Sequence, residues 1–145
     1  IKEADLIILS MGSLYTSLLP NLICDEIKQA IDESKAEVMY ICNIMTQPGE
    51  TDKFTASDHV NIVNSYLNKK KIDIILANTG SITKVMKEKY ASLEQKDPVT
   101  FDKKNLKNMN VKIISDDFVA ISDGMLRHDT TKLGFHIYSY LILGR

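Results

Sequence analysis

The sequence predicts an α/β protein with a three-layer α/β/α, Rossmann-like arrangement around a mostly parallel sheet. Short continuous apolar runs, typical of strands covered on both faces, occur three times, and each is followed by a segment with helical periodicity. Strands that alternate with helices need crossover connections, which make neighbouring strands parallel. The chain has 145 residues, of which 44% are apolar and 26% charged, so we expect residues 1–145 to form one domain portion with a single core.

The first half of the chain predicts two strands and two helices. Strands are expected at 6–9 and 38–42, the first ending in a break at 10–13. A helix is expected after Pro20, because apolar residues there recur at helical spacing. A second helix should begin at a capping box formed by Thr55 and Asp58 and close near the lysines at 69–71.

The second half repeats the strand and helix alternation. A third strand is expected at 72–77 and a helix after it through Tyr90, whereas 91–110 is polar and irregular. A fourth strand is expected at 111–115. A strand-like run at 118–121 precedes a turn at Asp123-Gly124, and Asp129 or Thr130 should cap a last helix.

Charge and hydropathy argue against several classes of protein. Eighteen Lys and Arg against nineteen Asp and Glu give a net charge of −1, so no basic field would attract nucleic acid. No apolar run approaches the ~20 residues of a membrane span, and we expect a soluble, cytoplasmic protein. Cys24 and Cys42 occupy apolar contexts without metal-site spacing, and we expect buried free thiols. Because the chain opens at Ile1 without a leader, we expect it to be part of a longer polypeptide.

The loops after the strands are the expected place for a ligand, since doubly wound sheets bind ligands at the carboxyl ends of their strands. A segment rich in glycine and hydroxyl groups follows the first strand, and we interpret it as a candidate phosphate cradle. It comprises Gly12, Ser13, Leu14, Tyr15 and Thr16. It lacks both Gly-x-Gly-x-x-Gly and the lysine of a P-loop, so a tight turn with hydroxyl caps is the alternative.

Two asparagines end the next strands. Asn43 follows the second strand, and Asn78 is followed by Thr79 and Gly80 after the third. Side-chain amides can read a base or a sugar hydroxyl, although asparagine at a strand end also forms turns. We expect both amides to project into one crevice.

Charged groups in the loops offer further candidates, each with a structural alternative. Glu50 and Asp52 could serve in acid–base chemistry, could hold Mg²⁺ with a diphosphate, or could belong to a solvated loop. His59 has no second ligand at metal spacing and is interpreted as a surface or cleft residue, so we assign no metal ligand. Arg127 precedes a helix start and could grip a phosphate, or pair with Asp123 or Asp129.

The ordered motifs resemble those of the CofD/YvcK-like proteins. The similarity includes Gly12-Ser13-Leu14-Tyr15-Thr16-Ser17, then 42–51 with Asp58-His59-Val60, then Asn78-Thr79-Gly80, and finally Leu126-Arg127-His128-Asp129. The stretch Asn43 to Thr51 looks most like the bacterial YvcK branch, the gluconeogenesis factors. One departure is Ser10-Met11, where the family usually has Gly-Pro.

The resemblance implies a Rossmann-like fold, with this chain as the carboxyl-terminal portion and the Gly-rich nucleotide loop of the amino-terminal half absent. The YvcK branch is associated with UDP-sugar binding, gluconeogenic growth and control of cell shape and wall synthesis, with no established reaction. The transferase branch moves a phospholactyl group from a guanosine diphosphate donor with Mg²⁺.

We therefore expect a UDP-sugar-binding regulatory protein, a homo-oligomer such as a dimer, with a nucleotide diphosphate sugar as its partner and no certain cofactor. One alternative is a CofD-like transferase using Mg²⁺, and a second is an NAD-type dinucleotide binder, which no Gly-x-Gly-x-x-Gly supports. No nucleophile with an adjacent base identifies a catalytic residue. Phosphorylation at Thr130, next to Arg127, is a hypothesis for regulation.

Overall fold

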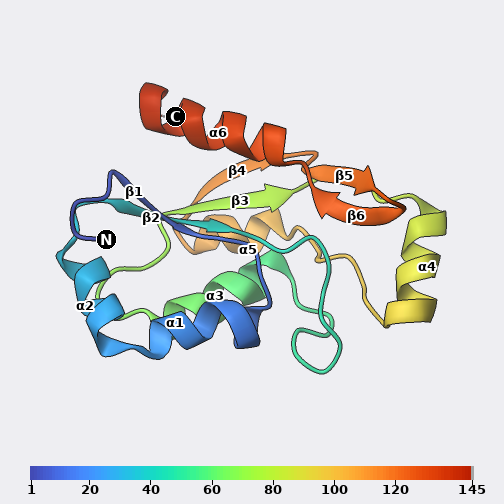
Figure 1. Cartoon of the computed structure of the whole chain (residues 1–145), viewed down its shortest axis with the longest axis horizontal. Coiled ribbons are helices and arrows are strands. Elements are labelled where there is room, and N and C mark those ends of the chain that lie inside the picture. The colour runs from blue at the N-terminus through green and yellow to red at the C-terminus, as the bar shows by residue number, and fades with distance from the viewer. Residues whose placement is uncertain (145) are drawn as a thin grey trace.

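The computed structural model describes residues 1–144 and has a four-stranded parallel sheet at its centre (Figure 1). Its strands, in spatial as well as chain order, are β1 (Leu6–Leu9), β2 (Glu37–Ile41), β3 (Ile74–Asn78) and β4 (Lys112–Asp116). Adjacent strands pair in parallel, with Tyr40 opposite Ile75. The fold class predicted from the sequence is confirmed.

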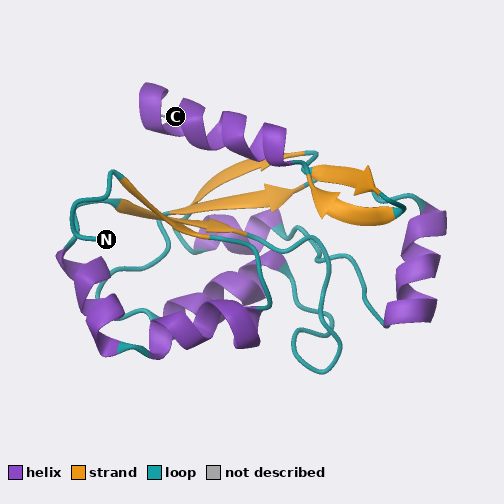
Figure 2. Cartoon of the chain, viewed as in Figure 1, coloured by secondary structure: helices purple, strands orange, loops and turns teal. Residues whose placement is uncertain are grey.

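Helices cover both faces of the sheet, which gives three layers (Figure 2). One face carries α1 (Leu19–Ile23), α2 (Asp25–Glu33), α3 (Ala56–Tyr66) and α5 (Lys103–Asn108). Because the strands follow one another in one direction across the sheet, right-handed crossovers place these helices on the same face. The opposite face carries α6 (Thr130–Leu143), which follows β4 and a hairpin.

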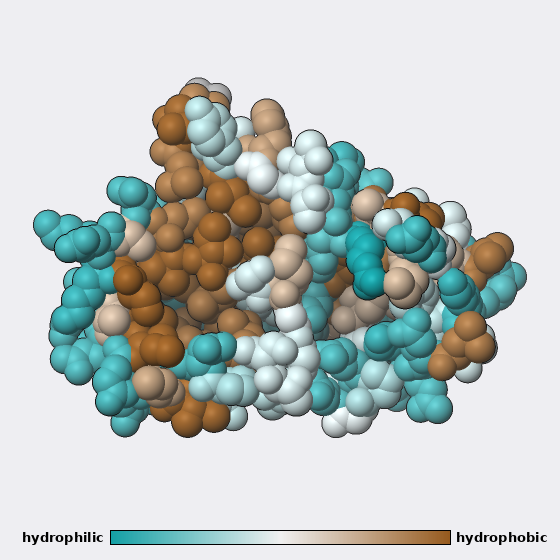
Figure 3. Space-filling view, in the orientation of Figure 1, coloured by the Kyte–Doolittle hydropathy of each residue, from teal (hydrophilic) through white to brown (hydrophobic). Residues whose placement is uncertain are grey.

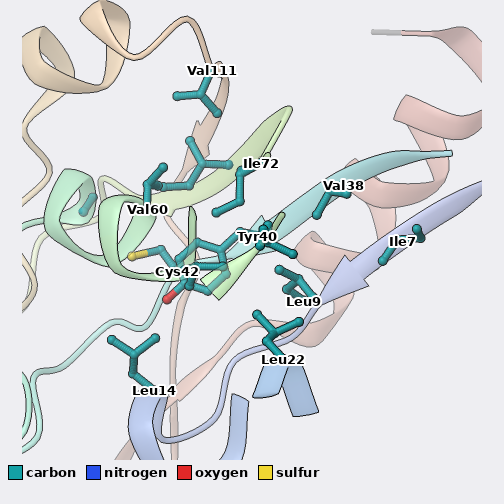
Figure 4. Packing of buried hydrophobic residues seen from close by; sticks show 14 of the residues in the cluster. Ile7, Leu9, Leu14, Leu22, Val38, Tyr40, Cys42, Val60, Ile72 and Val111 are labelled. Atoms are coloured by element: carbon teal, nitrogen blue, oxygen red, sulfur yellow. The ribbon is translucent and has the colours of Figure 1, made fainter. Parts of the chain in front are cut away.

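The core explains why the strand sequences are continuously apolar. In β2, Val38 and Tyr40 point toward α1 and α3, while Met39 and Ile41 point toward α6, and all four are buried. Figure 4 shows Tyr40 and Cys42 among the aliphatic side chains of the first face. Both faces of a central parallel strand are withdrawn from water, so alternation with polar residues is lost.

A smaller unit lies beside the main sheet. It contains α4 (Lys84–Glu94) and an antiparallel hairpin of β5 (Val119–Ser122) and β6 (Met125–His128). Tyr90 of α4 is buried, and its hydroxyl accepts a hydrogen bond from the Leu126 backbone over 2.8 Å. This contact, together with a small apolar cluster, fixes α4 against the hairpin.

Most of the caps and turns predicted from local sequence are confirmed. Thr55 and Asp58 form the predicted capping box of α3, and Asp129 caps α6 by accepting from the Lys132 backbone. Asp123 and Gly124 have φ values of 52° and 68°, as the predicted hairpin turn requires. Among residues 1–144, no helix has both the length and the apolar composition to cross a bilayer.

Three expectations about the elements were wrong. The helix predicted after Pro20 is two helices, because Cys24 between α1 and α2 has extended backbone with ψ of 118°. Cys24 is exposed there, whereas Cys42 is buried as expected. The stretch 91–110 contains the end of α4 and all of α5, whose one buried side chain, Leu106, gives too weak a periodic signal to predict a helix.

The loop predicted as a cradle is also more regular than expected. Leu14–Leu18 form a single π-helical turn, labelled η1 in the element order, which runs directly into α1. Ser13 caps this turn by accepting a hydrogen bond from the Thr16 backbone over 3.2 Å. The hydroxyl-capped turn that was the alternative to a cradle is therefore present.

Candidate functional site

A polar cleft of about 250 Å³ lies between the carboxyl ends of β1 and β2 and the hairpin unit. Its lining mixes hydroxyl, amide and cationic groups over an apolar floor, and none of the lining residues is Asp or Glu. They are Met11, Gly12, Ser13, Asn43, Ile44, Met45, Thr46, Gln47, Lys96, Leu126, Arg127 and His128. The position agrees with the rule that parallel sheets bind ligands at their carboxyl ends.

The loops after β1 and β2 form the neutral wall of the cleft. The Asn43 amide donates to the Gly12 carbonyl over 2.8 Å, which joins the two loops. Ser13 Oγ donates to Glu50 Oε2 over 2.8 Å and so connects this wall to the long polar loop. Four of the predicted residues, Gly12, Ser13, Asn43 and Arg127, therefore line one cleft.

The other cradle residues lie outside the cleft. Leu14 is buried in the main core under the sheet, because the π-helical turn directs it inward. Tyr15 is partly exposed, and neither it nor Thr16 lines the cleft. The Thr16 backbone N–H instead donates a hydrogen bond to the Ser13 hydroxyl, which caps the turn. The structure thus retains the start of the predicted cradle as a cleft wall and uses the rest for packing and helix capping.

The cationic wall comes from the hairpin unit. Arg127 is in β6, not in a loop. Its guanidinium makes no ion pair among residues 1–144, and its Nη2 donates a hydrogen bond of 3.7 Å to Met125 Sδ. The alternative of a pair with Asp123 or Asp129 was wrong. Lys96 joins this wall, paired with Glu94 over 2.7 Å. A guanidinium without a carboxylate partner is available to a ligand oxyanion.

His128 supports this wall and remains neutral near pH 7. Its Nε2 lies 3.2 Å from the Cys42 carbonyl oxygen, which assigns the proton to Nε2 as a donor. Burial lowers the pKa of His128, and the hydrogen bond to Cys42 opposes that shift only in part. The ring thus ties β6 to the end of β2, next to Arg127, without adding a full charge.

Asn78, Thr79 and Gly80 lie at a second hollow, of about 210 Å³, between the loop after β3 and the segment containing Phe101. Asn78 Oδ1 accepts from the backbones of Gly80 over 3.1 Å and Phe118 over 2.9 Å, so it ties the loops after β3 and β4 together. Asn43 and Asn78 end neighbouring parallel strands and share only a small void. The single crevice expected for both amides is divided.

The candidate metal residues, Glu50 and Asp52, each accept a hydrogen bond from within the chain. Glu50 accepts from Ser13, and Asp52 accepts from the Gly49 backbone over 2.8 Å. Within the described residues 1–144, no group of three His, Cys, Asp or Glu side chains could hold an ion. Protein-bound Mg²⁺ uses one or two carboxylates besides phosphate oxygens. The cleft lining offers none, so its residues do not fit Mg²⁺.

His59 and Thr130 also have clear positions. His59 is fully buried at 0% exposure in the first turns of α3, so the expectation of a surface or cleft residue was wrong. Its Nδ1 lies 2.9 Å from the Thr55 carbonyl oxygen, and burial lowers its pKa. Thr130 is exposed and is the first residue of α6.

Sequence reasoning missed four polar lining residues: Thr46, Gln47, Lys96 and His128. Thr46 and Lys96 are distant in sequence, and two hydrogen bonds bring them together: the Thr46 N–H donates to the Asp97 carbonyl over 2.8 Å, and the Asp97 N–H donates to Thr46 Oγ1 over 2.9 Å. No local periodicity signals such a pairing. The signal for His128 was present in its position beside Arg127.

This fold and cleft define an α/β protein with a candidate ligand site at the carboxyl edge of a parallel sheet, lined by cationic, hydroxyl and amide groups. The family model for 2-phospho-L-lactate transferase CofD matches residues 1–119. The chain belongs to this CofD family.

Curated relatives carry a different name from the family model. The gluconeogenesis factor of Bacillus subtilis is 46% identical over 133 residues, which are 92% of this chain and 42% of that protein. The gluconeogenesis factor of Halalkalibacterium halodurans is 45% identical over 133 residues, 92% of this chain and 41% of that protein. The chain thus spans less than half the length of these relatives.

A solved structure agrees with the fold. The crystal structure of protein BH3568 from Bacillus halodurans, a member of the upf0052 family, superposes with a TM-score of 0.89 at 44% identity. The match covers 94% of this chain and 44% of that one. The predicted resemblance to the CofD/YvcK-like proteins, gluconeogenesis factor branch, is confirmed.

Proposed function

We propose that the cleft binds the diphosphate of a UDP-sugar and that the chain belongs to a regulatory protein of gluconeogenic growth and cell shape. One observation carries the proposal: Arg127 has no carboxylate partner among residues 1–144, and it lines a cleft together with neutral hydroxyl and amide groups and no acid. A diphosphate supplies the missing negative charge, and charge-assisted hydrogen bonds to a guanidinium are among the stronger ones in proteins.

The neutral wall suits the sugar side of such a ligand. Asn43, Thr46 and Gln47 carry amide and hydroxyl groups, and the Gln47 Oε1 is buried without a partner among residues 1–144. At about 250 Å³ the cleft is small compared with the ~300–1,000 Å³ of ligand pockets. We therefore assign it the diphosphate and the adjoining sugar, not the whole ligand.

A transferase is the second candidate, favoured by the family model that residues 1–119 match. Under this proposal a group linked to phosphate would leave a nucleoside diphosphate donor bound in the same cleft. The absence of carboxylates from the cleft lining counts against a metal bound by these residues. The regulatory binding function is therefore the better supported of the two.

Calorimetry distinguishes the candidates. Residues 1–145 and the intact Bacillus subtilis relative would each be titrated with UDP-GlcNAc, GDP and NAD. Tightest binding of UDP-GlcNAc supports the proposal. Preference for GDP supports the transferase, preference for NAD supports a dinucleotide binder, and binding of none of the three by either protein refutes the site.

A further inference from the structure

The hydroxyl group of Ser13 has most of its hydrogen-bonding capacity in use. A serine hydroxyl carries one proton and two lone pairs. Ser13 donates the proton to Glu50 Oε2 over 2.8 Å and accepts from the Thr16 backbone N–H over 3.2 Å. The Ser13 carbonyl also accepts from the backbones of Ser17 and Leu18, each over 3.0 Å, which fixes the residue at the cleft wall. What Ser13 Oγ still offers a ligand is one lone pair, so it can accept a hydrogen bond but has no proton left to donate.

Glu50 is held behind Ser13 by the turn to which it belongs. The N–H groups of Glu50 and Thr51 donate to the Gln47 carbonyl over 3.1 Å and 2.9 Å, and Thr51 Oγ1 accepts from the Gln47 N–H over 2.8 Å. Thr51 is buried, which anchors the turn. Glu50 does not line the cleft, and its carboxylate makes no ion pair among residues 1–144. A negative charge therefore lies next to the Ser13 hydroxyl without a cation to neutralise it.

The same loop contributes a second unused acceptor. Gln47 lines the cleft, and its Oε1 is buried without a hydrogen-bond partner among residues 1–144. An unpaired buried carbonyl oxygen is costly, so an N–H or O–H group of a ligand would stabilise it. Figure 3 shows mostly hydrophilic and neutral residues where Figure 1 places the long loop between β2 and α3, whereas apolar residues gather over β1, β2 and α6. The neutral wall thus suits a polar group that carries hydrogen-bond donors.

We propose that Ser13, polarised by Glu50, accepts a hydrogen bond from a hydroxyl or N–H group of the sugar and so sets the orientation of the ligand in the cleft. This inference rests on the proposed function and specifies which end of a UDP-sugar meets which wall. Ionised phosphate oxygens only accept hydrogen bonds, so a Ser13 without a free proton does not bind them, and the charge of Glu50 repels them. Arg127 and Lys96 only donate, and they take the diphosphate.

Two residues of the neutral wall therefore have different roles from those that the sequence predicts. Ser13, expected in a phosphate cradle, contacts the sugar. Glu50, expected as an acid–base residue, a Mg²⁺ ligand or part of a solvated loop, is a positioning residue that acts through Ser13.

The affinity contributed by the sugar tests this assignment. Calorimetry of residues 1–145 with UDP and with UDP-GlcNAc gives two dissociation constants, and we call the first divided by the second the sugar ratio. Glu50→Gln keeps an acceptor oxygen for Ser13 but removes the charge, and it should lower the sugar ratio about three- to tenfold while the Kd of UDP changes little. Ser13→Ala should lower the ratio about tenfold. Arg127→Ala should instead weaken the binding of both ligands and leave the ratio unchanged.

Asp52→Asn is the matched control for charge. It removes the same charge from the same loop, but Asp52 is exposed and accepts from the Gly49 backbone, not from a residue of the cleft. Its sugar ratio should equal that of the unmodified chain. Ser13 also caps the π-helical turn, so melting temperatures accompany the titrations. If Ser13→Ala does not fold, Glu50→Gln decides, because it leaves the cap in place.

The possible outcomes separate this inference from the proposed function. An unchanged sugar ratio in Glu50→Gln overturns the inference alone, and a tenfold gain in UDP affinity in that variant would assign the Ser13 proton to phosphate, with Glu50 as its competitor. A sugar ratio of one in the unmodified chain also overturns it, because the sugar then makes no contact that matters. Failure of the unmodified chain to bind either ligand refutes the proposed function and this inference with it.

Discussion

The side-chain amide of Asn43 donates a hydrogen bond to the carbonyl oxygen of Gly12 over 2.8 Å and thereby joins the loops that follow β1 and β2. This bond positions Gly12 at the cleft wall although the two residues are far apart in sequence. We expect Asn43→Ala to cost about 1 kcal/mol of stability, as for a typical intramolecular hydrogen bond, and also to weaken UDP-GlcNAc binding. Chemical denaturation and calorimetry measure the two effects, and unchanged affinity would remove Asn43 from the site.

Arg127 should contribute most to ligand affinity. A charge-assisted hydrogen bond to phosphate is worth roughly 1.5–3 kcal/mol, so Arg127→Ala should weaken UDP-GlcNAc binding by about one to two decades. The melting temperature should hardly change, because the exposed guanidinium makes no ion pair among residues 1–144. Arg127→Lys should restore affinity only in part, because lysine lacks the planar fork. Equal affinities of the three proteins would exclude Arg127.

Gly12 offers a test of close backbone approach. A Cβ at this position would lie 3.2 Å from the Ser17 Cβ, so a side chain also presses on the π-helical turn. We expect Gly12→Val to abolish nucleotide binding while the circular dichroism spectrum stays native. The double variant Gly12→Val with Ser17→Gly removes the contact between the valine and the Ser17 side chain. If the valine blocks the ligand, this double variant should still not bind nucleotide. Recovery of binding would attribute the loss to displacement of the turn.

Gly80 should be required for packing and not for the ligand. A Cβ there would lie 1.8 Å from Asp117 Oδ1, so Gly80→Ala should destabilise the protein by about 1–3 kcal/mol, as overpacking does. Asp117→Ala in the same chain removes the two closest contacts but keeps the Cβ at 2.9 Å, so it should recover part of that loss. Gly134→Ala is the matched control: its Cβ meets open space within a helix, and it should stabilise by up to about 1 kcal/mol. Denaturant midpoints of the four proteins decide.

Stability should fall as pH drops below about 6.5, the pKa of histidine in an unfolded chain. Burial lowers the pKa of His59 and of His128 in the folded state, so the unfolded state binds more protons in this range. The contribution of the two neutral histidines to the free energy of unfolding is thus complete above pH 6.5. It decreases as pH falls from 6.5 through the folded-state pKa values. Urea denaturation between pH 5 and 8 measures this. His59→Gln should flatten the dependence, and an unchanged slope would refute the assignment.

The amino-acid sequence by itself determined the elements whose signals are local. The continuous apolar runs at β2 and β3 specified buried parallel strands, because a strand covered on both faces has no polar side. The run at β1 also specified a parallel strand, although its Ile8 is 39% exposed. The capping box at Thr55 and the turn at Asp123-Gly124 were also predictable from the sequence, since each depends on residues within three positions of one another. The motifs from Gly12 to His128 identified the family for the same reason: they are short and in fixed order.

Tertiary structure decided what depends on partners distant in sequence. Lys96 lines the cleft because two hydrogen bonds, one between backbones and one to the Thr46 hydroxyl, pair Thr46 with Asp97. Leu14 lies outside the cleft because its side chain packs in the main core. His59 is buried because its helix packs under the sheet, although its neighbours in sequence are polar. Asn43 and Asn78 look alike in sequence, but the hydrogen bonds of Asn78 to Gly80 and Phe118 separate their roles. Pairing between residues distant in sequence set these outcomes, and such pairing leaves no periodic signal in the sequence.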